Sequence, residues 1–173
     1  MKNLTHIGCL LILSILAFSS CASQKTVTAT EQDFAALINN RRFTFVARTV
    51  IPTEDSRFNP RFMFPNGNNL YQLTSGYDVK ITPDSVTAYL PFFGRSFTAP
   101  LDPTKGGIQF TSTDFDYKQS IKKKNYQITI TPKDNRDIRS LLLTVTPSGY
   151  AYLQVLSMNK TPISFNGVIE KDQ

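Results

Sequence analysis

Apolar residues recur at every second position in a series of short runs from residue 43 onward, and turn residues separate the runs. Alternation with a period of two places the apolar side chains of a run on one face of an extended strand. Many short runs of this kind are typical of antiparallel β-structure. The clearest runs cover residues 43–48, 77–81, 86–90, 126–130, 141–145, 151–155 and 163–165.

Three of the connections between these runs contain a Thr-Pro dipeptide, at Thr82-Pro83, Thr131-Pro132 and Thr146-Pro147. Proline presets φ for the second position of a turn, and the Asp, Ser or Gly residues that follow suit the next positions. We therefore predict a hairpin over residues 77–90 and a four-stranded antiparallel meander over residues 126–168, with its last turn at residues 160–162. The curved sheet would bury its apolar face either by closing into a barrel-like sheet or by folding into a β-sandwich.

One short helix is predicted at the start of the domain. Phe34, Leu37 and Ile38 have the i, i+3, i+4 spacing of a single apolar helical stripe. Thr30 is suited to cap its first turn, and the pair of asparagines after Ile38 is suited to end it. No Gly/Ser-rich linker divides the rest of the chain, so we expect one mainly β domain with a short N-terminal helix over residues 31–173.

The first 21 residues have the layout of an export signal. Lys2 precedes an uncharged apolar run at residues 7–18, shorter than the ~20 residues that span a bilayer, and small residues lead up to Cys21. These small residues resemble the lipobox of bacterial lipoproteins, with Phe18 where that signal usually has leucine. The resemblance implies a diacylglycerol thioether on Cys21, cleavage before it, and acylation of the new amino group, for example by palmitate. A plain secretory signal cut near Ala22 is the alternative.

We divide the chain into a signal peptide at residues 1–20, a flexible tether at residues 21–30 and a domain at residues 31–173. The full chain has 173 residues and a formal net charge of +6, and loss of the signal leaves 153 residues with a charge of +5. His6 and Cys9 leave with the signal, so the mature protein has no histidine and no free thiol. Most designs for nucleophilic catalysis and for histidine metal sites are thereby removed. We predict a non-enzymatic protein without cofactor or metal.

Four ordered motifs stand out in the mature chain. They are Tyr89-Leu90-Pro91-Phe92-Phe93-Gly94-Arg95, Gly106-Gly107-Ile108-Gln109-Phe110, Phe115-Asp116-Tyr117 and Ser164-Phe165-Asn166-Gly167. Together with the N-terminal signal they resemble a Bacteroidetes lipoprotein family, the domain of unknown function 4251. The resemblance implies a secreted, lipid-anchored, β-rich domain with no assigned activity, and it carries over no catalytic residues.

The first of these motifs also has a local structural logic. Pro91 cannot donate a ladder hydrogen bond and should end a strand, and Gly94 permits a tight or left-handed turn. Phe92 and Phe93 are adjacent, so one should point inward and the other outward. Arg95 then either pairs with a carboxylate or faces a ligand. The candidate carboxylates are Asp102, Asp114 and Asp116.

Two residue pairs could support chemistry without histidine or thiol. Ser120 and Lys123 match the Ser-x-x-Lys pattern, but that motif belongs at the start of a helix and here lies in a basic β-connection. Asp114 and Asp116 would share a strand face, as paired catalytic carboxylates do, although a solvated polar face is the simpler interpretation. Residues 134–137 lack the central Gly and terminal Glu of a calcium loop and are predicted to form a turn.

Two surface features remain. Lys118 and residues 122–124 form a basic cluster, which either meets an anionic partner, such as lipid headgroups or a phosphorylated glycan, or protects a hairpin tip or edge strand from aggregation. We favour the protective role. Residues 57–69 combine Phe and Arg with Pro and Asn, and their aromatic rings either stack on a sugar or peptide or tuck into the core. We favour tucking into the core.

The leading functional hypothesis is a lipid-anchored, non-enzymatic binding or accessory module of the cell envelope. It would sit in the outer membrane through lipid on Cys21. In Bacteroidetes lipoproteins an acidic run after the lipidated cysteine resembles a surface-export signal, and because no such run follows Cys21 we expect the protein to face the periplasm. Its partner would be a peptide, a glycan or a protein, and not nucleic acid. The alternatives are a hydrolase that uses carboxylates or Ser-Lys chemistry, and a structural envelope protein without a small ligand. The candidate ligand-binding residues are Phe92, Phe93, Arg95, Arg57, Phe58, Arg61 and Phe62.

Overall fold

Within the described residues the chain forms one helix and nine antiparallel strands. The computed structural model describes residues 29–52, 71–74, 76–98 and 106–172. The elements are α2 (Ala29–Asn39), β1 (Phe43–Pro52), β2 (Asp78–Ile81), β3 (Val86–Leu90), β4 (Ile108–Ser112), β5 (Phe115–Lys122), β6 (Asn125–Pro132), β7 (Ile138–Val145), β8 (Tyr150–Ser157) and β9 (Ile163–Lys171).

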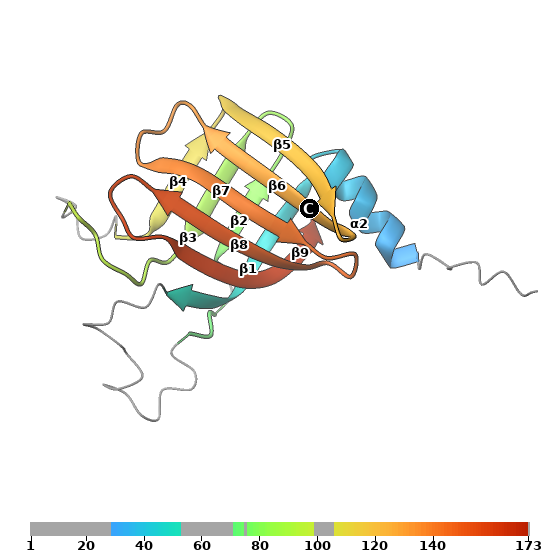
Figure 1. Cartoon of the computed structure of the whole chain (residues 1–173), viewed down its shortest axis with the longest axis horizontal. Coiled ribbons are helices and arrows are strands. Elements are labelled where there is room, and N and C mark those ends of the chain that lie inside the picture. Colours follow the sequence, from blue (N-terminus) through green and yellow to red (C-terminus); the bar gives the residue numbers. More distant parts are fainter. Residues whose placement is uncertain (1–28, 53–70, 75, 99–105, 173) are drawn as a thin grey trace, which may run out of the picture.

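The strands form a single sheet in the order β4-β3-β2-β1-β9-β8-β7-β6-β5. Strands that are consecutive in sequence are therefore neighbours in the sheet, except for β4 and β5, which are its two free edges. The first strand, β1, also pairs with the last, β9. The sheet curls into a nearly closed barrel, so the two edges approach each other where the chain passes from β4 to β5 (Figure 1). The prediction of a mainly β domain with one short helix is confirmed, and the barrel-like alternative is the one adopted.

The core lies inside the curled sheet and is built from alternate residues of the strands other than β5, whose Phe115 and Tyr117 are partly buried and pack against it. In β3 the buried residues are Val86, Ala88 and Leu90, and the residues between them are exposed. β1 and β9 contribute the largest fully buried side chains, Phe43, Phe45 and Phe165. When the sheet curls, its apolar face closes on itself. The buried side chains of distant strands then leave water together.

Helix α2 covers one end of the barrel (Figure 1). Its Ile38 is completely buried, and Phe34 and Leu37 pack against the core beside it. A Cβ on Gly149, in the turn between β7 and β8, would overlap the Phe34 ring, so this glycine lets the turn close over the helix. The predicted stripe of Phe34, Leu37 and Ile38 is thus the buried face.

The predicted turns agree with the structure, and the predicted cap does not. Thr82 accepts hydrogen bonds from the backbone of Ser85 and donates back to the same residue, which closes the β2–β3 hairpin. The four strands β6 to β9 form the predicted meander. Helix α2 begins at Ala29, so Thr30 lies inside its first turn and is not the cap. No helix in the described part of the chain is long and apolar enough to cross a bilayer.

The ladder between β1 and β9 contains a bulge and a close approach. Its register shifts between Ala47, which pairs with Gly167, and Thr49, which pairs with Asn166. A bulge of this kind bends a strand and increases its twist, as a curled sheet requires. A Cβ on Gly167 would overlap the carbonyl oxygen of Val46 and press on the Phe45 ring. Only glycine therefore allows β9 to lie this close to β1.

We predict that Gly167→Ala lowers the free energy of unfolding by about 2–3 kcal/mol, because backbone atoms of β1 must move to admit the new methyl group. Chemical denaturation monitored by circular dichroism measures the change. Asn166→Ala is the control, since Asn166 is exposed on the same strand and its loss should cost no more than about 0.5 kcal/mol. Equal losses from the two variants would contradict this account of the close approach.

Candidate functional site

The corner between β4 and β5 is held by the turn between β6 and β7. The carboxylate of Asp134 accepts hydrogen bonds from the hydroxyl of Ser112 at 2.5 Å and from the backbone N–H groups of Thr113 and Asp114 at 2.8 and 3.2 Å. In return, the backbone N–H of Lys133 donates to the carbonyl of Asp114 at 2.8 Å. These contacts join the two free edges of the sheet where no ladder of the described residues does so.

Hydrogen bonding sets the charge of this corner. The Ser112 hydroxyl, and after it the N–H of Thr113, hold the pKa of the Asp134 carboxyl below its usual range. Beside it, the ammonium of Lys133 lies 2.6 Å from the carboxylate of Asp116, which lowers the pKa of Asp116 and raises that of Lys133. Both carboxylates are therefore ionised at neutral pH. Asp134 accepts the hydrogen bonds that hold the corner, and Asp116 forms the ion pair beside it.

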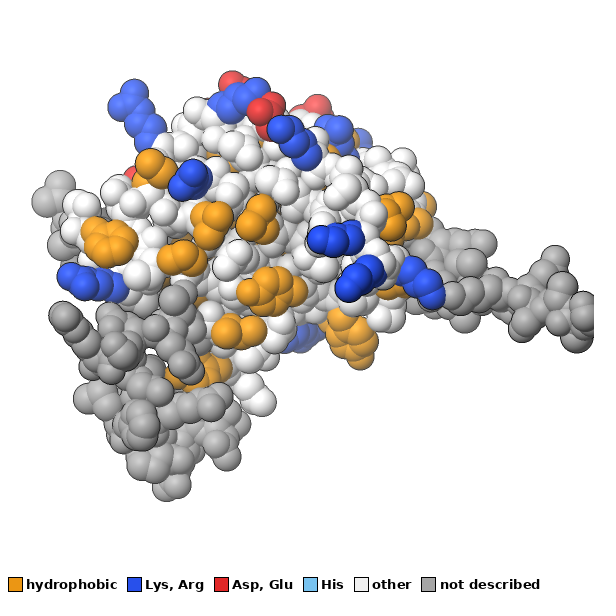
Figure 2. Space-filling model, in the orientation of Figure 1, with side chains coloured by type: hydrophobic (Ala, Val, Ile, Leu, Met, Phe, Trp, Pro, Cys, Tyr) orange, Lys and Arg blue, Asp and Glu red, His pale blue; other side chains and the backbone are white. Residues whose placement is uncertain are grey.

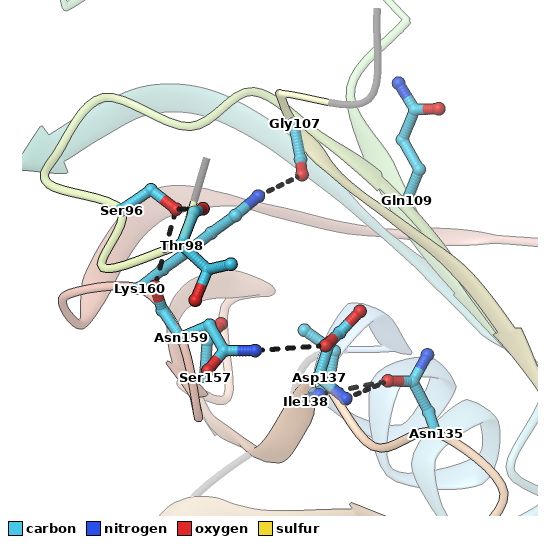
Figure 3. A pocket seen from close by; sticks show the side chains of 10 residues that line it. All are labelled: Ser96, Thr98, Gly107, Gln109, Asn135, Asp137, Ile138, Ser157, Asn159 and Lys160. Carbon is cyan, nitrogen blue, oxygen red and sulfur yellow. Dashed lines mark hydrogen bonds between the residues drawn. The ribbon is translucent and has the colours of Figure 1, made fainter. Parts of the chain in front are cut away.

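A polar pocket of about 500 Å³ lies close to this corner, among the loops that follow β3, β6 and β8 (Figure 3). Six of its ten lining residues carry amide or hydroxyl side chains, and its ionisable groups are Asp137 and Lys160. The lining residues are Ser96, Thr98, Gly107, Gln109, Asn135, Asp137, Ile138, Ser157, Asn159 and Lys160.

Hydrogen bonds between loops hold the pocket open. The backbone carbonyl of Asn159 accepts from the N–H of Phe97 at 2.8 Å, and the N–H of Met158 donates to the carbonyl of Asp137 at 2.9 Å. Within the β6–β7 turn, the side-chain oxygen of Asn135 accepts from the N–H groups of Asp137 and Ile138. The three loops are thus tied into one frame before any ligand arrives.

Lys160 joins two walls of this frame. Its ammonium donates to the carbonyl groups of Gly106 at 3.0 Å and Gly107 at 2.6 Å, and it lies 5.0 Å from the centroid of the Phe92 ring. Burial lowers the pKa of Lys160, and the nearby carboxylate of Asp137 opposes that shift. The contacts show a lysine that is partly withdrawn from water and stabilised by carbonyl dipoles and an aromatic face.

The Tyr89–Arg95 motif supplies part of the same frame. Pro91 follows the last residue of β3 as predicted, Phe92 packs against the core, and Phe93 is 47% exposed, so one phenylalanine points inward and the other outward. Gly94 does not have a positive φ. The chain bends at Gly94 without the left-handed conformation, and a Cβ there would lie 2.7 Å from the Thr161 hydroxyl, so glycine is needed for the close approach of the two loops.

Arg95 lies on the surface beside the pocket. Its backbone exchanges hydrogen bonds with Thr161, and its guanidinium lies 5.8 Å from the centroid of the exposed Phe97 ring. It forms no ion pair with Asp114 or Asp116, and the third predicted partner, Asp102, lies outside the described residues. Of the two alternatives for Arg95, the salt bridge is not formed with either described carboxylate, and Asp116 pairs with Lys133 instead.

The family model for a domain of unknown function, DUF4251, matches residues 25–169. The chain belongs to this family. The match covers α2 and every strand into β9, which is the whole described domain apart from its last residues. No curated protein and no solved structure matches the chain.

The catalytic candidates of this DUF4251 domain do not converge in the pocket. Asp114 and Asp116 are both exposed at the corner, and neither lines the pocket. Ser120 and Lys123 are exposed on the β5–β6 hairpin and do not lie at the start of a helix. Burial raises the pKa of Tyr117 to about 12, so its phenol keeps its proton at neutral pH. No cluster of three potential metal ligands occurs among the described residues.

The remaining predicted sites lie at the far end of the barrel, in the turn between β6 and β7, or outside the described residues. Residues 122–124 form the tip of the β5–β6 hairpin, and β5 is an edge strand, as the protective interpretation requires. Residues 134–137 form the predicted turn between β6 and β7. Cys21 and the whole of residues 57–69, including four of the candidate ligand-binding residues, lie outside the described chain. Those four residues are Arg57, Phe58, Arg61 and Phe62.

Sequence reasoning missed the polar pocket of the DUF4251 domain. Its lining comes from three loops, and the two that follow β6 and β8 were predicted only to be turns. The third, after β3, carries the candidate ligand-binding residues Phe92, Phe93 and Arg95, and none of these three lines the pocket. Asn135, Asn159 and Lys160 carry no motif, and their proximity depends on strand pairings far apart in sequence. The available signal was asparagine next to both the β6–β7 and β8–β9 turns. Asparagine is common in turns, so this signal does not distinguish a binding pocket from an ordinary turn.

We predict that Asp134→Asn destabilises the DUF4251 domain at neutral pH, because an amide cannot accept from all three donors at the corner. The depressed pKa of Asp134 means that its stabilisation is present above the unfolded pKa, near 4, and is lost as the pH falls through the lower folded pKa. The difference in unfolding midpoint between the two proteins should therefore shrink in acid. Thermal unfolding over a pH series measures it.

Asp116→Asn is the matched control, because Asp116 is also exposed and its carboxylate carries only the surface ion pair with Lys133. Exposed pairs contribute little to stability. A loss as large as that of Asp134→Asn would show that the corner is held by charge and not by the backbone hydrogen bonds.

Proposed function

We propose that this protein is a lipid-anchored, non-enzymatic binding module of the cell envelope, and that the pocket between the β3–β4, β6–β7 and β8–β9 loops binds a polar ligand. The observation that carries the proposal is a volume of about 500 Å³ lined by amides and hydroxyls whose frame is already tied together. Pockets of this size hold small ligands, and preorganised polar groups reduce the entropic cost of binding them.

The chemistry of the lining favours a glycan fragment or a short peptide. Both ligand classes are rich in hydroxyl, amide and carboxylate groups, which pair with side chains such as Asn159, Ser157 and Gln109. Lys160 adds a positive charge whose donors are already turned toward carbonyl groups of the β3–β4 loop. The ligand would then add to an existing network and would not have to build one.

Binding accounts for the pocket better than hydrolysis does. Glycoside hydrolysis uses two carboxylates on opposite sides of the scissile bond, and the described lining supplies one, Asp137. That carboxylate also accepts a hydrogen bond from the Asn159 amide at 3.4 Å. A Ser-Lys mechanism needs a serine hydroxyl beside a lysine amine free to take its proton. Lys160 is instead a donor to two carbonyls.

The membrane anchor is supported by the sequence of the first 21 residues. An apolar run, small residues and Cys21 follow one another in the order of a lipoprotein signal. Together with the family match, this layout favours a bacterial lipoprotein of the outer membrane that faces the periplasm, of the kind found in Bacteroidetes. Several acyl chains on one residue give stable anchoring, since each buried methylene contributes about 0.8 kcal/mol.

The pocket is tested by titrating the protein with envelope glycan fragments and with short peptides, followed by NMR chemical-shift changes or calorimetry. Asn159→Leu should weaken binding about fivefold, because one hydrogen bond of about 1 kcal/mol is lost while the backbone contacts of residue 159 remain. Asn166→Leu, the same substitution at an exposed position of β9 outside the pocket, should leave binding unchanged.

A different pattern would move or remove the site. A smaller depression of about 270 Å³ lies on the outer face of β6, β7 and β8 and includes Tyr152 and Gln154. Weakening by Gln154→Leu with no effect of Asn159→Leu would place the ligand there. Release of a cleaved product during the titration would overturn the non-enzymatic proposal.

The anchor has its own test. Cys21→Ala removes the sulfur that carries the lipid, so the protein should lose its acyl chains and leave the membrane fraction after cell disruption. Mass spectrometry of the purified wild-type chain should show the added acyl groups on Cys21. Unmodified Cys21 in the wild type would contradict the anchor and leave the pocket proposal standing.

A further inference from the structure

The tip of the β5–β6 hairpin is built from two lysines in an unfavourable backbone conformation. Lys122 pairs with Asn125, so Lys123 and Lys124 alone form the turn, with φ of 50° and 71°. A two-residue turn with positive φ at both positions favours Asn-Gly, because an L side chain other than Asn or Asp is strained there. The hairpin therefore carries two charges at positions where a relaxed turn would carry none.

A basic residue with positive φ is also found where helix α2 ends. Arg41 follows the helix with φ of 52°, in the position that usually belongs to glycine, and Arg42 donates its N–H back to the carbonyl of Leu37. Arg41, Lys123 and Lys124 are all the non-glycine residues with positive φ in the described chain. Each of the three is basic. Backbone strain that persists at one place is a reason to look for a function there.

These basic residues lie at one end of the molecule. The guanidinium of Arg41 is 4.6 Å from the centroid of the Tyr117 ring on β5, and Gln119 of β5 donates to Asn39 of α2 at 3.0 Å. The end of α2 is thus in contact with the strand that leads into the hairpin. Figure 2 shows Lys and Arg side chains on the part of this face nearest α2, while the acidic side chains lie elsewhere in the view.

The cluster is exposed and its charge is not neutralised within the described chain. Arg41, Arg42 and residues 122–124 are all exposed, and none of them forms an ion pair with a described carboxylate. Ile121, one residue before the cluster, is 67% exposed, the largest exposed fraction among the described large apolar side chains. Exposed cations around an exposed apolar residue are typical of a surface that meets lipid headgroups.

We infer that this end of the barrel, defined by Arg41, Arg42, Ile121 and residues 122–124, docks onto the anionic surface of the membrane that holds the lipid anchor. The inference rests on the proposed anchoring through Cys21. Seven residues separate Cys21 from the start of α2, so the lipid lies within about 30 Å of the helix even if they are fully extended. The anchor therefore holds the basic end near the bilayer, and the pocket lies at the opposite end.

The chain offers a clean reporter for this contact because it contains no tryptophan. Ile121→Trp places a single tryptophan at the basic end. Met158→Trp places one at the pocket end, where Met158 is 61% exposed and does not line the pocket. The full chain, processed and acylated in cells, is reconstituted into vesicles whose lipids carry brominated acyl chains, which quench tryptophan fluorescence at close range.

In brominated phosphatidylcholine vesicles that contain phosphatidylglycerol, fluorescence at position 121 should be quenched at least twofold more than at position 158. In vesicles of phosphatidylcholine alone the difference should shrink sharply, because surface potential provides much of the attraction. Equal quenching at the two positions, or the same quenching with and without phosphatidylglycerol, overturns the docking inference. If the basic end binds an anionic glycan instead of lipid, quenching should be the same with and without phosphatidylglycerol.

The strained turn supplies a charge variant that we expect to fold at least as well as the wild type. Lys123→Asn with Lys124→Gly removes two charges and installs the preferred turn, so the protein should become more stable to denaturant. The ratio of docked to undocked protein, from quenching at position 121, should fall about thirtyfold, since each lysine near an anionic surface contributes about 1 kcal/mol. Unchanged quenching in this variant would falsify the docking surface. Failure of the anchor itself is recognised separately, since mass spectrometry would then find no acyl chains on Cys21.

Discussion

The pairing of the first strand with the last is the constraint on which the rest of this fold depends. β1 to β4 form one meander and β5 to β9 another, and only the ladder between β1 and β9 makes them a single curled sheet. That ladder brings Phe45 and Phe165 into one core and requires Gly167 to lie against the backbone of Val46. The loops that frame the pocket come from both meanders, so the pocket exists only because this ladder forms.

Local features of the sequence were enough to predict most of the strands but not their closure. The alternation at residues 86–90 and the turn chemistry of Thr82 are local, and each is realised in the β2–β3 hairpin. The choice between barrel and sandwich depends on contacts between residues near 43 and residues near 171, which leave no local pattern. The roles of Asp134 and Lys160 were missed for the same reason, because their partners lie in other loops.

The two ends of the barrel differ in the residues and contacts that form them. At one end, polar loops are joined by backbone hydrogen bonds and by a lysine held between carbonyl groups, and they surround a cavity. At the other end, a helix covers the core and basic residues occupy strained positions on the surface. A protein tethered by its N-terminus would present the first end to the surroundings and the second to its support, so anchoring and binding could operate without interfering.

The seam between β4 and β5 gives the chain an unusual relation between sequence and topology. Phe43 and Lys171 are paired across the β1–β9 ladder, so the start of β1 and the end of β9 are neighbours in space. A circular permutant that began at β5 and joined β9 to β1 would have the strands in the same order around the sheet, with every ladder between consecutive strands. Its one long-range ladder would become local, and folding would no longer have to wait for the two ends of the chain to meet.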